Sequence, residues 1–144
     1  MSRFDWHPPQ DEVELVVRLL DAVPELADSY HEHLLDNDEL LPYHYLPDAV
    51  RALELMMHQG RLTEETRSQV AALIEAALEE GGSIRNLALL GLVEEIANAH
   101  VMSVIRSYPS LLECMRDAFG PLTKEALSDD LADSAFLNAK PQKN

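Results

Sequence analysis

Carboxylates spaced to share one side of a helix are the chemical feature that stands out in this sequence. At about 100° per residue, four of them fall within an arc of roughly 80°, and these are Glu25, Asp28, Glu32 and Asp36. No Lys or Arg lies between positions 19 and 50 to balance their charge. Such a stripe suits a docking surface for a basic partner or part of a divalent-cation site, although a solvated outer face has the same pattern. Together with Asp38 and Glu39, the stripe is the predicted partner-binding surface.

Histidines near this stripe do not have the spacing of a metal centre. His31 and His33 point about 160–200° apart on a helix, and no pair has the i, i+3 or i, i+4 spacing that helical metal sites use. Residues 36–39 resemble the start of a calcium loop, but Leu40 and Leu41 take the next two positions. We therefore expect no metal ion and no cofactor, and we interpret the histidines as boundary residues with hydrated ring nitrogens.

A second polar group interrupts an apolar stretch later in the chain. Gly91, Glu94, Glu95 and Asn98 lie within an arc of roughly 100° on an expected helix. A glycine there costs about 1 kcal/mol against alanine, so we expect it to admit a close neighbouring helix or to leave a small groove. Adjacent Glu94 and Glu95 diverge by about 100°, which disfavours an acid–base pair. The alternative is that this arc is simply the exposed strip of the helix.

No catalytic residue is predicted. The single cysteine, Cys114, lies at the edge of an apolar helix face without a recognisable base, which is typical of an inert thiol. A Gly-rich phosphate loop, a nucleophile elbow and a paired-cysteine metal knuckle are all missing. One cysteine also excludes an intramolecular disulfide, and residues 1–10 do not have the pattern of a signal peptide. We therefore expect a cytoplasmic protein.

The elements that must position these groups are helices, because helical spacing recurs throughout and strict alternation does not occur. Capping residues, prolines and glycines predict helices over approximately these ranges: 11–23, 24–36, 47–60, 64–80, 83–107, 111–119 and 123–133. The expected caps are two capping boxes, Asp11 with Glu14 and Ser110 with Glu113, and the single residues Thr63 and Ser83.

Apolar spacing predicts which sides of the first two helices are buried. The first should bury Val13, Val16, Val17 and Leu20, and the second should bury Leu26, Ala27, Tyr30 and Leu34. Between the second and third helices, residues 37–45 are expected to form an irregular connector, with Pro47 opening the third helix. Because residues 40–46 are unusually apolar, we expect them to pack on the core or on another chain, with the core favoured.

These patterns predict an all-α fold, an irregular bundle of six or seven helices around the segment 83–107, or helical hairpins that stack. With 144 residues, we expect a single domain over 1–137 and a frayed tail over 138–144. Two segments, 36–48 (Asp-Asn-Asp-Glu-Leu-Leu-Pro-Tyr-His-Tyr-Leu-Pro-Asp) and 85–94, resemble those of a family of short bacterial helical domains of unknown function. The resemblance implies an all-helical fold of about this length and no activity or cofactor.

Charge narrows the classes of partner. The net charge is −15, and the first 50 residues hold twelve of the 26 acidic residues against two basic ones. This balance disfavours nucleic acid and anionic membranes, and the apolar run 87–93 is too short to span a bilayer. The sequence thus predicts a non-enzymatic interaction module that binds a basic protein, similar in size and acidity to bacterial immunity and antitoxin proteins. The alternatives are a carboxylate-based metal-dependent hydrolase, a small-ligand binder in the bundle core, or a structural subunit that dimerises through residues 40–46.

Overall fold

The computed structural model describes residues 9–139, with side-chain surroundings as far as residue 132. Its elements are α1 (Gln10–Ala22), the 3-10 turn η1 (Pro24–Leu26), α2 (Ala27–Asn37), α3 (Pro42–His58), α4 (Glu64–Glu80), α5 (Gly82–Ala88), the π-helical turn η2 (Leu89–Val93), α6 (Glu94–Arg106), α7 (Leu111–Met115) and α8 (Pro121–Ala139). Since α5, η2 and α6 follow one another without a break, the described residues form seven helices and no strand. The predicted all-α class is confirmed.

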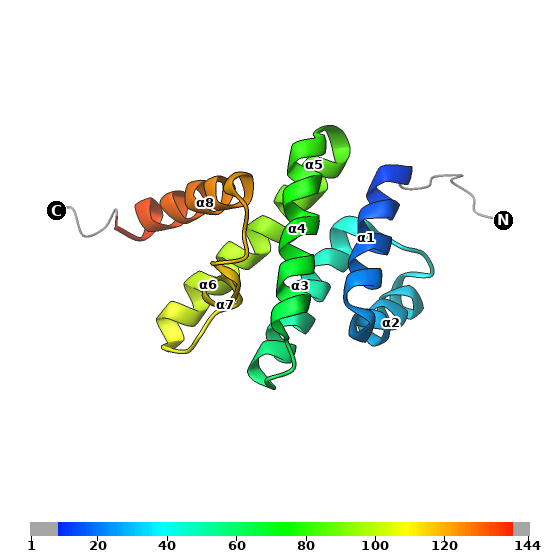
Figure 1. The fold of residues 1–144 in the computed structure, drawn as a ribbon, viewed down its shortest axis with the longest axis horizontal. Helices are drawn as coiled ribbons and strands as arrows, with labels where there is room; N and C mark the ends of the chain where they lie inside the picture. Colours follow the sequence, from blue (N-terminus) through cyan, green and yellow to red (C-terminus); the bar gives the residue numbers. More distant parts are fainter. Residues whose placement is uncertain (1–8, 140–144) are drawn as a thin grey trace.

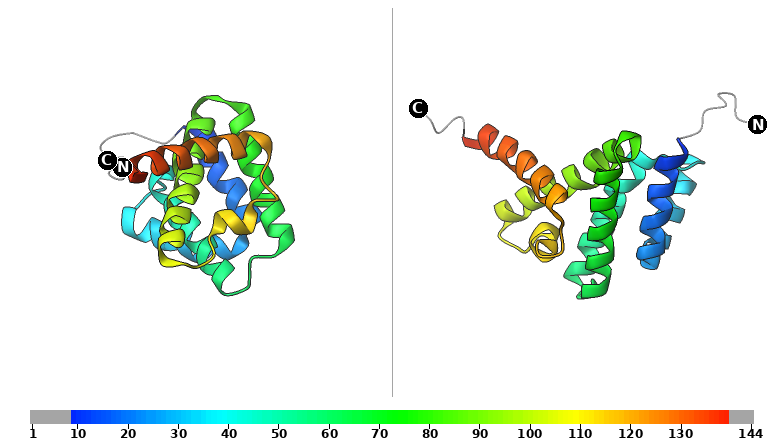
Figure 2. Two further views of the ribbon diagram at one scale, coloured as in Figure 1. Left: turned by 90° about the vertical axis from the view of Figure 1, so that its left-hand side faces the viewer. Right: turned by 45° about the horizontal axis from the view of Figure 1, so that its top comes forward.

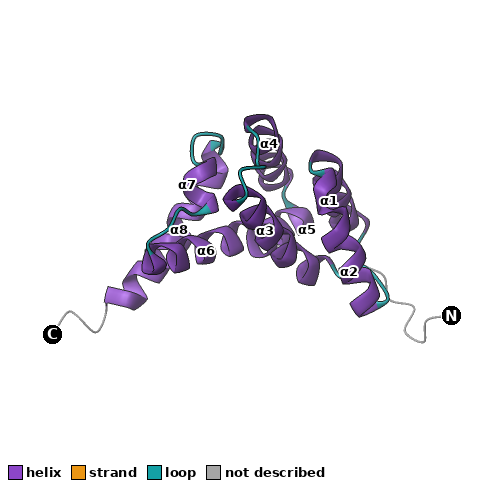
Figure 3. Ribbon diagram, turned by 90° about the horizontal axis from the view of Figure 1, so that it is seen from below, coloured by secondary structure: helices purple, strands orange, loops and turns teal. Residues whose placement is uncertain are grey.

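The helices follow one another along the long axis of the molecule (Figure 1). α3 and α4 lie in the middle, α1 and α2 lie at one end, and α6, α7 and α8 lie at the other. The same order is visible in the right-hand view of Figure 2 and, from below, in Figure 3. Contacts agree with this arrangement, since α1 packs on α3, α4 and α5, α2 packs on α3, and α8 packs on α4 and α6. The two ends therefore meet different sides of one central layer.

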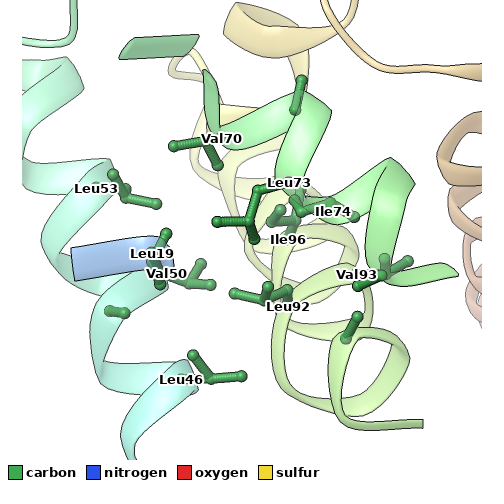
Figure 4. Close-up of a cluster of buried hydrophobic side chains, with 14 of the residues drawn as sticks. Leu19, Leu46, Val50, Leu53, Val70, Leu73, Ile74, Leu92, Val93 and Ile96 are labelled. Atoms are coloured by element: carbon green, nitrogen blue, oxygen red, sulfur yellow. The ribbon is translucent and has the colours of Figure 1, made fainter. Parts of the chain in front are cut away.

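The core lies where α3, α4 and the long helix 82–106 face one another (Figure 4). Each contributes branched side chains to this cluster: Leu46, Val50 and Leu53 from α3, Val70, Leu73 and Ile74 from α4, and Leu92, Val93 and Ile96 from the long helix. Burying one such side chain stabilises the fold by about 1.5–3 kcal/mol. The long helix contacts α1, α3, α4, α7 and α8. Its predicted central place is confirmed only in part, because its second half, α6, lies at one end of the molecule (Figure 1).

Two of the predicted caps are confirmed. The Thr63 hydroxyl accepts a hydrogen bond from the Thr66 N–H at 3.2 Å, at the start of α4. Ser110 and Glu113 form a reciprocal capping box at the start of α7. In both cases the bond joins residues three apart, so it depends only on the local sequence.

The other two caps are wrong because their side chains bind each other. α1 begins at Gln10 after Pro9, without a side-chain cap, and α5 begins at Gly82. Ser83 Oγ instead donates to the Asp11 carboxylate, which joins α5 to α1 across 72 positions of sequence. A tertiary contact has therefore replaced two expected local ones.

The prediction that Pro47 opens the third helix is also wrong. α3 begins five residues earlier, at Pro42, and Pro47 lies inside it. An interior proline removes one helical hydrogen bond and strains the preceding turn. The burial of the neighbouring Tyr45 and Leu46, both fully inaccessible, offsets that cost. The apolar segment 40–46 is thus mostly helical, and its two most buried residues face the core as expected.

The predicted buried faces are partly displaced. α1 buries Leu15, Val16 and Leu19, whereas Val17 is 46 % exposed. The period is helical as expected, but contact with three other helices decides which side turns inward. α8 extends from Pro121 to Ala139 and so includes residues 138 and 139 of the expected tail. Residues 1–8 and 140–144 of the expected domain and tail lie outside the described residues.

The long helix Gly82–Arg106 is, by length and composition alone, long and apolar enough to cross a membrane, with a mean hydropathy of 1.4 over its most apolar window. Within that window, 39 % is buried inside the structure. The core helix of a soluble protein has the same length and composition.

Candidate interaction surface

The six predicted carboxylates all lie on the outside of one end of the molecule. Glu25 belongs to η1, and Asp28, Glu32 and Asp36 belong to α2, which Figure 1 shows beside α1. Asp38 ends α2 in the left-handed conformation, with φ of 64°, and Glu39 follows it. All six side chains are exposed, and none forms an ion pair within the described part of the chain.

The basic residues nearest to this surface in sequence already have acidic partners. Arg18 of α1 pairs with Glu14 and with Glu80 of α4, and Arg51 of α3 pairs with Asp48. From residue 10 to residue 41 the chain holds ten acidic residues and only one basic residue, Arg18. The charge of this end is therefore largely uncompensated.

Tyr45 of α3 anchors the inner side of η1 and α2. Its hydroxyl is 3.0 Å from Ser29 Oγ and donates to the Leu26 carbonyl oxygen at 3.4 Å. The ring of Tyr30 meets it edge-on, with centroids 5.6 Å apart. Burial raises the pKa of Tyr45, which keeps the phenol neutral and able to donate. The carboxylate surface is thus held against the core through its opposite side.

His33 is the second anchor, and its predicted boundary position with hydrated nitrogens is wrong. It is only 3 % exposed, its ring centroid lies 5.4 Å from that of Tyr45, and its Nε2 accepts the Leu41 N–H at 3.0 Å. Asn37 Nδ2 lies 3.2 Å from Nδ1 and donates to the His33 carbonyl oxygen at 2.9 Å. A sequence signal for this position exists, since residue 33 follows Leu26 and Tyr30 by seven and three positions.

The second predicted group does not line one groove. Gly91 is buried, and a Cβ at that position would lie 2.8 Å from Leu46 Cδ1, so the glycine admits close approach of α3. Glu94 lines a depression of about 320 Å³ between the long helix and α8. Glu95 and Asn98 line another, of about 260 Å³, between α3 and α6. Of the two expectations for Gly91, the structure shows the close neighbouring helix.

Metal-dependent and nucleophilic chemistry gain no geometric support from the described residues. Among them, no three His, Cys, Asp or Glu side chains come together in a way that could hold a metal ion. Cys114 is half-buried, and the nearest histidine in sequence, His100, bonds to Ser110 Oγ at 2.7 Å.

A half-buried carboxylate that the sequence did not reveal holds the other end of the molecule in place. Glu75 of α4 accepts the Leu122 N–H through Oε2 at 3.0 Å and the Thr123 N–H and hydroxyl through Oε1 at 3.0 and 2.9 Å. It thereby caps α8 from a residue 47 positions away. Burial raises the pKa of this carboxyl, but the three hydrogen bonds outweigh burial and lower it overall.

No protein-family model, curated protein or solved structure matches the chain. The resemblance of residues 36–48 and 85–94 to a bacterial helical family therefore stays a prediction. Fold and surface together define a class only: an all-α protein with an exposed acidic end.

Proposed function

We propose that this chain is a non-enzymatic interaction module, of the immunity or antitoxin type, whose α2 end binds a basic partner protein. The observation that carries the proposal is the set of six exposed carboxylates without a counter-ion in the described structure. Three of them recur along a single helix at i, i+4 and i+8, which are Asp28, Glu32 and Asp36. Like charges at this spacing destabilise an isolated helix, so folding alone does not favour them.

The chemistry of the surface indicates what it would recognise. Carboxylates accept paired hydrogen bonds from an arginine guanidinium, which makes an Arg-rich surface the best complement. A field of one sign also accelerates encounter with an oppositely charged protein, and salt weakens this effect. Screening reaches about 8 Å at physiological salt, so the neighbouring carboxylates of α2 act together on an approaching partner.

The test is affinity capture from the native lysate with the full chain as bait, at about 50 and 500 mM salt, a range over which screening lengths shorten several-fold. Three baits are compared: the unchanged chain, a stripe variant and a charge-matched control. The stripe variant carries Glu25→Gln, Asp28→Asn, Glu32→Gln and Asp36→Asn. The control neutralises four exposed carboxylates elsewhere, Glu79→Gln, Asp117→Asn, Glu125→Gln and Asp129→Asn.

The expected result is a basic protein held at low salt by the unchanged chain and by the control, and lost from the stripe variant. Equal loss from both variants would assign the binding to net charge and not to α2. Unchanged binding by the stripe variant, with the same dependence on salt, would overturn the proposal.

A further inference from the structure

The imidazole ring of His33 holds α2 to the start of α3 through a hydrogen bond that it can accept only while it is uncharged. His33 Nε2 accepts the Leu41 N–H at 3.0 Å, across the connector 38–41. Because the backbone amide can only donate, Nε2 must be unprotonated, and the neutral ring carries its proton on Nδ1. Asn37 then flanks Nδ1 without donating to it. An imidazolium has a proton on both nitrogens, so protonation must break the bond to Leu41.

Charged groups from both helices face this ring. Burial has the largest effect and lowers the pKa of His33, Asp48 of α3 and Asp36 of α2 raise it, and His44 of α3 lowers it. The net result is a lowered pKa, which keeps the ring neutral near pH 7. The adjacent Tyr45 stays neutral over the same range, because burial raises its pKa.

We propose that His33 is a pH-sensitive clasp: mild acidification charges the ring, releases the Leu41 amide and loosens α2 from α3. When the junction is open and hydrated, the ring has the ordinary histidine pKa of about 6.5. When it is closed, the pKa is lower, so the open form binds more protons. Closure is therefore fully favoured above about pH 6.5 and weakens as the pH falls from there toward the closed-state pKa.

The clasp acts on the segment that carries most of the acidic surface. α2 and its connector hold five of the six exposed carboxylates: Asp28, Glu32, Asp36, Asp38 and Glu39. Loosening this segment disperses their charges. Only this consequence for a partner rests on the proposed function, since the clasp itself involves residues of this chain alone.

The test is amide hydrogen exchange of the full chain by NMR at pH 7.5 and 5.5, corrected for the intrinsic effect of pH on exchange. Below the open-state pKa, each pH unit can shift the closing equilibrium up to about tenfold. We expect protection of Leu41 and the α2 amides to fall by several-fold to about tenfold relative to the α4 amides. In His33→Gln, the side-chain oxygen can accept a hydrogen bond from the Leu41 N–H without titrating. The ratio of protection, Leu41 and α2 amides to α4 amides, should therefore become independent of pH.

His100→Gln is the matched control and should keep the response of the unchanged chain. The clasp would be overturned if the protection ratio of the unchanged chain were the same at both pH values. It would also be overturned if the ratio of His33→Gln fell from pH 7.5 to 5.5 as much as that of the unchanged chain.

A second measurement on the unchanged chain decides the matter if His33→Gln does not fold. Ring-nitrogen NMR should show the Nδ1–H tautomer at pH 7.5, with Leu41 changing as His33 titrates. The opposite tautomer, or titration without a change at Leu41, would contradict the proposal. Neither measurement uses a partner, so failure of the clasp leaves the proposed function standing, and the reverse holds as well.

Discussion

At each end of the molecule, a histidine side chain forms a hydrogen bond near the start of the next helix. The two groups that it bonds to differ in whether they can accept a hydrogen bond as well as donate one. His33 of α2 accepts from the backbone amide of Leu41, just before α3, whereas His100 of α6 bonds to the hydroxyl of Ser110, the cap of α7. A backbone amide only donates, while a hydroxyl both donates and accepts. The N-terminal junction therefore depends on one protonation state of its histidine, and the C-terminal junction is compatible with either.

The ends also differ in the group that ties them to the centre. Beside its histidine, the C-terminal end relies on Glu75, an ionised group that stabilises α8 as long as it stays deprotonated. Its folded-state pKa is lowered, so this contribution is present above the ordinary value of about 4.5 and disappears as the pH falls through the folded-state value. Acidification should thus loosen the N-terminal end first. The following substitutions would break or sharpen this contrast.

Replacing Tyr45 with alanine should have the largest effect. The change removes a fully buried aromatic ring and the anchor of η1 and α2, and such truncations cost about 3–5 kcal/mol. Urea denaturation at pH 7.5 measures the loss, with Tyr43→Ala as the partly exposed control from the same turn of α3. Equal losses for the two variants would show that the N-terminal end is not held through Tyr45.

The two histidines should differ when each is changed to alanine. His33→Ala leaves the Leu41 N–H without its acceptor, which costs about 1–3 kcal/mol at pH 7.5. His100→Ala should cost about 1 kcal/mol or less, because Ser110 keeps its bonds to Glu113. Denaturant unfolding of both variants at pH 7.5 gives the comparison, and a larger loss for His100→Ala would reverse the proposed contrast.

Replacing Glu75 with glutamine should cost about 1–2 kcal/mol near pH 7, because the single amide oxygen replaces a carboxylate that accepts three hydrogen bonds. The deficit should shrink as the pH falls below about 4.5, where the unchanged carboxyl also loses its charge. Unfolding of both proteins between pH 7 and 3 measures it, and a deficit that is constant with pH would exclude the charge as its source.

Gly120 provides a control for this site. A Cβ there would lie 2.5 Å from Glu75 Cδ, so Gly120→Ala must displace the carboxylate. The cost of Gly120→Ala should therefore be much smaller in a Glu75→Ala background, which lacks Cγ and Cδ, than in the unchanged chain. If the stability losses of the two substitutions were additive, the cost of Gly120→Ala would not come from a clash with the Glu75 side chain.

Changing Glu32 to glutamine should have the smallest effect, and it should be stabilising. The change relieves repulsion with Asp28 and Asp36, each four positions away, at about 0.2–0.5 kcal/mol per pair. Thermal unfolding at low salt should show the gain, and 1 M salt should remove most of it because screening then acts within about 3 Å. A loss of stability would show that Glu32 supports α2 and is not retained at a cost.

Features predicted correctly from the sequence depend on neighbours a few positions apart. The Thr63 cap, the Ser110–Glu113 box and the helix end at Gly81 each depend on bonds or backbone preferences within three residues. Exposure of Glu25, Asp28, Glu32 and Asp36 followed from the same logic, because they share one side of the predicted helix 24–36 and apolar residues share the opposite side. What these carboxylates bind stays a prediction.

Features missed or wrong depend on residues far apart in sequence. Pro47 is tolerated inside α3 only because α3 buries Tyr45 and Leu46 in the core. Ser83 was expected to cap a helix but binds Asp11, and Glu75 caps a helix that begins 46 positions later. The local sequence at these positions is compatible with both the expected and the observed role. It cannot decide between them, because the residue that makes the decisive contact lies far away in the sequence.

By itself, the sequence determined the all-α class, most helix ends and an acidic, outward-facing second helix, because turns, caps and amphipathic spacing are short-range properties of the chain. The tertiary structure alone decided which histidine is buried, which side of α1 turns inward and which carboxylate becomes structural. Those outcomes follow from how helices pack, because a packed side chain exchanges water for a partner that lies far away in the sequence, by as much as 72 positions for Ser83 and Asp11.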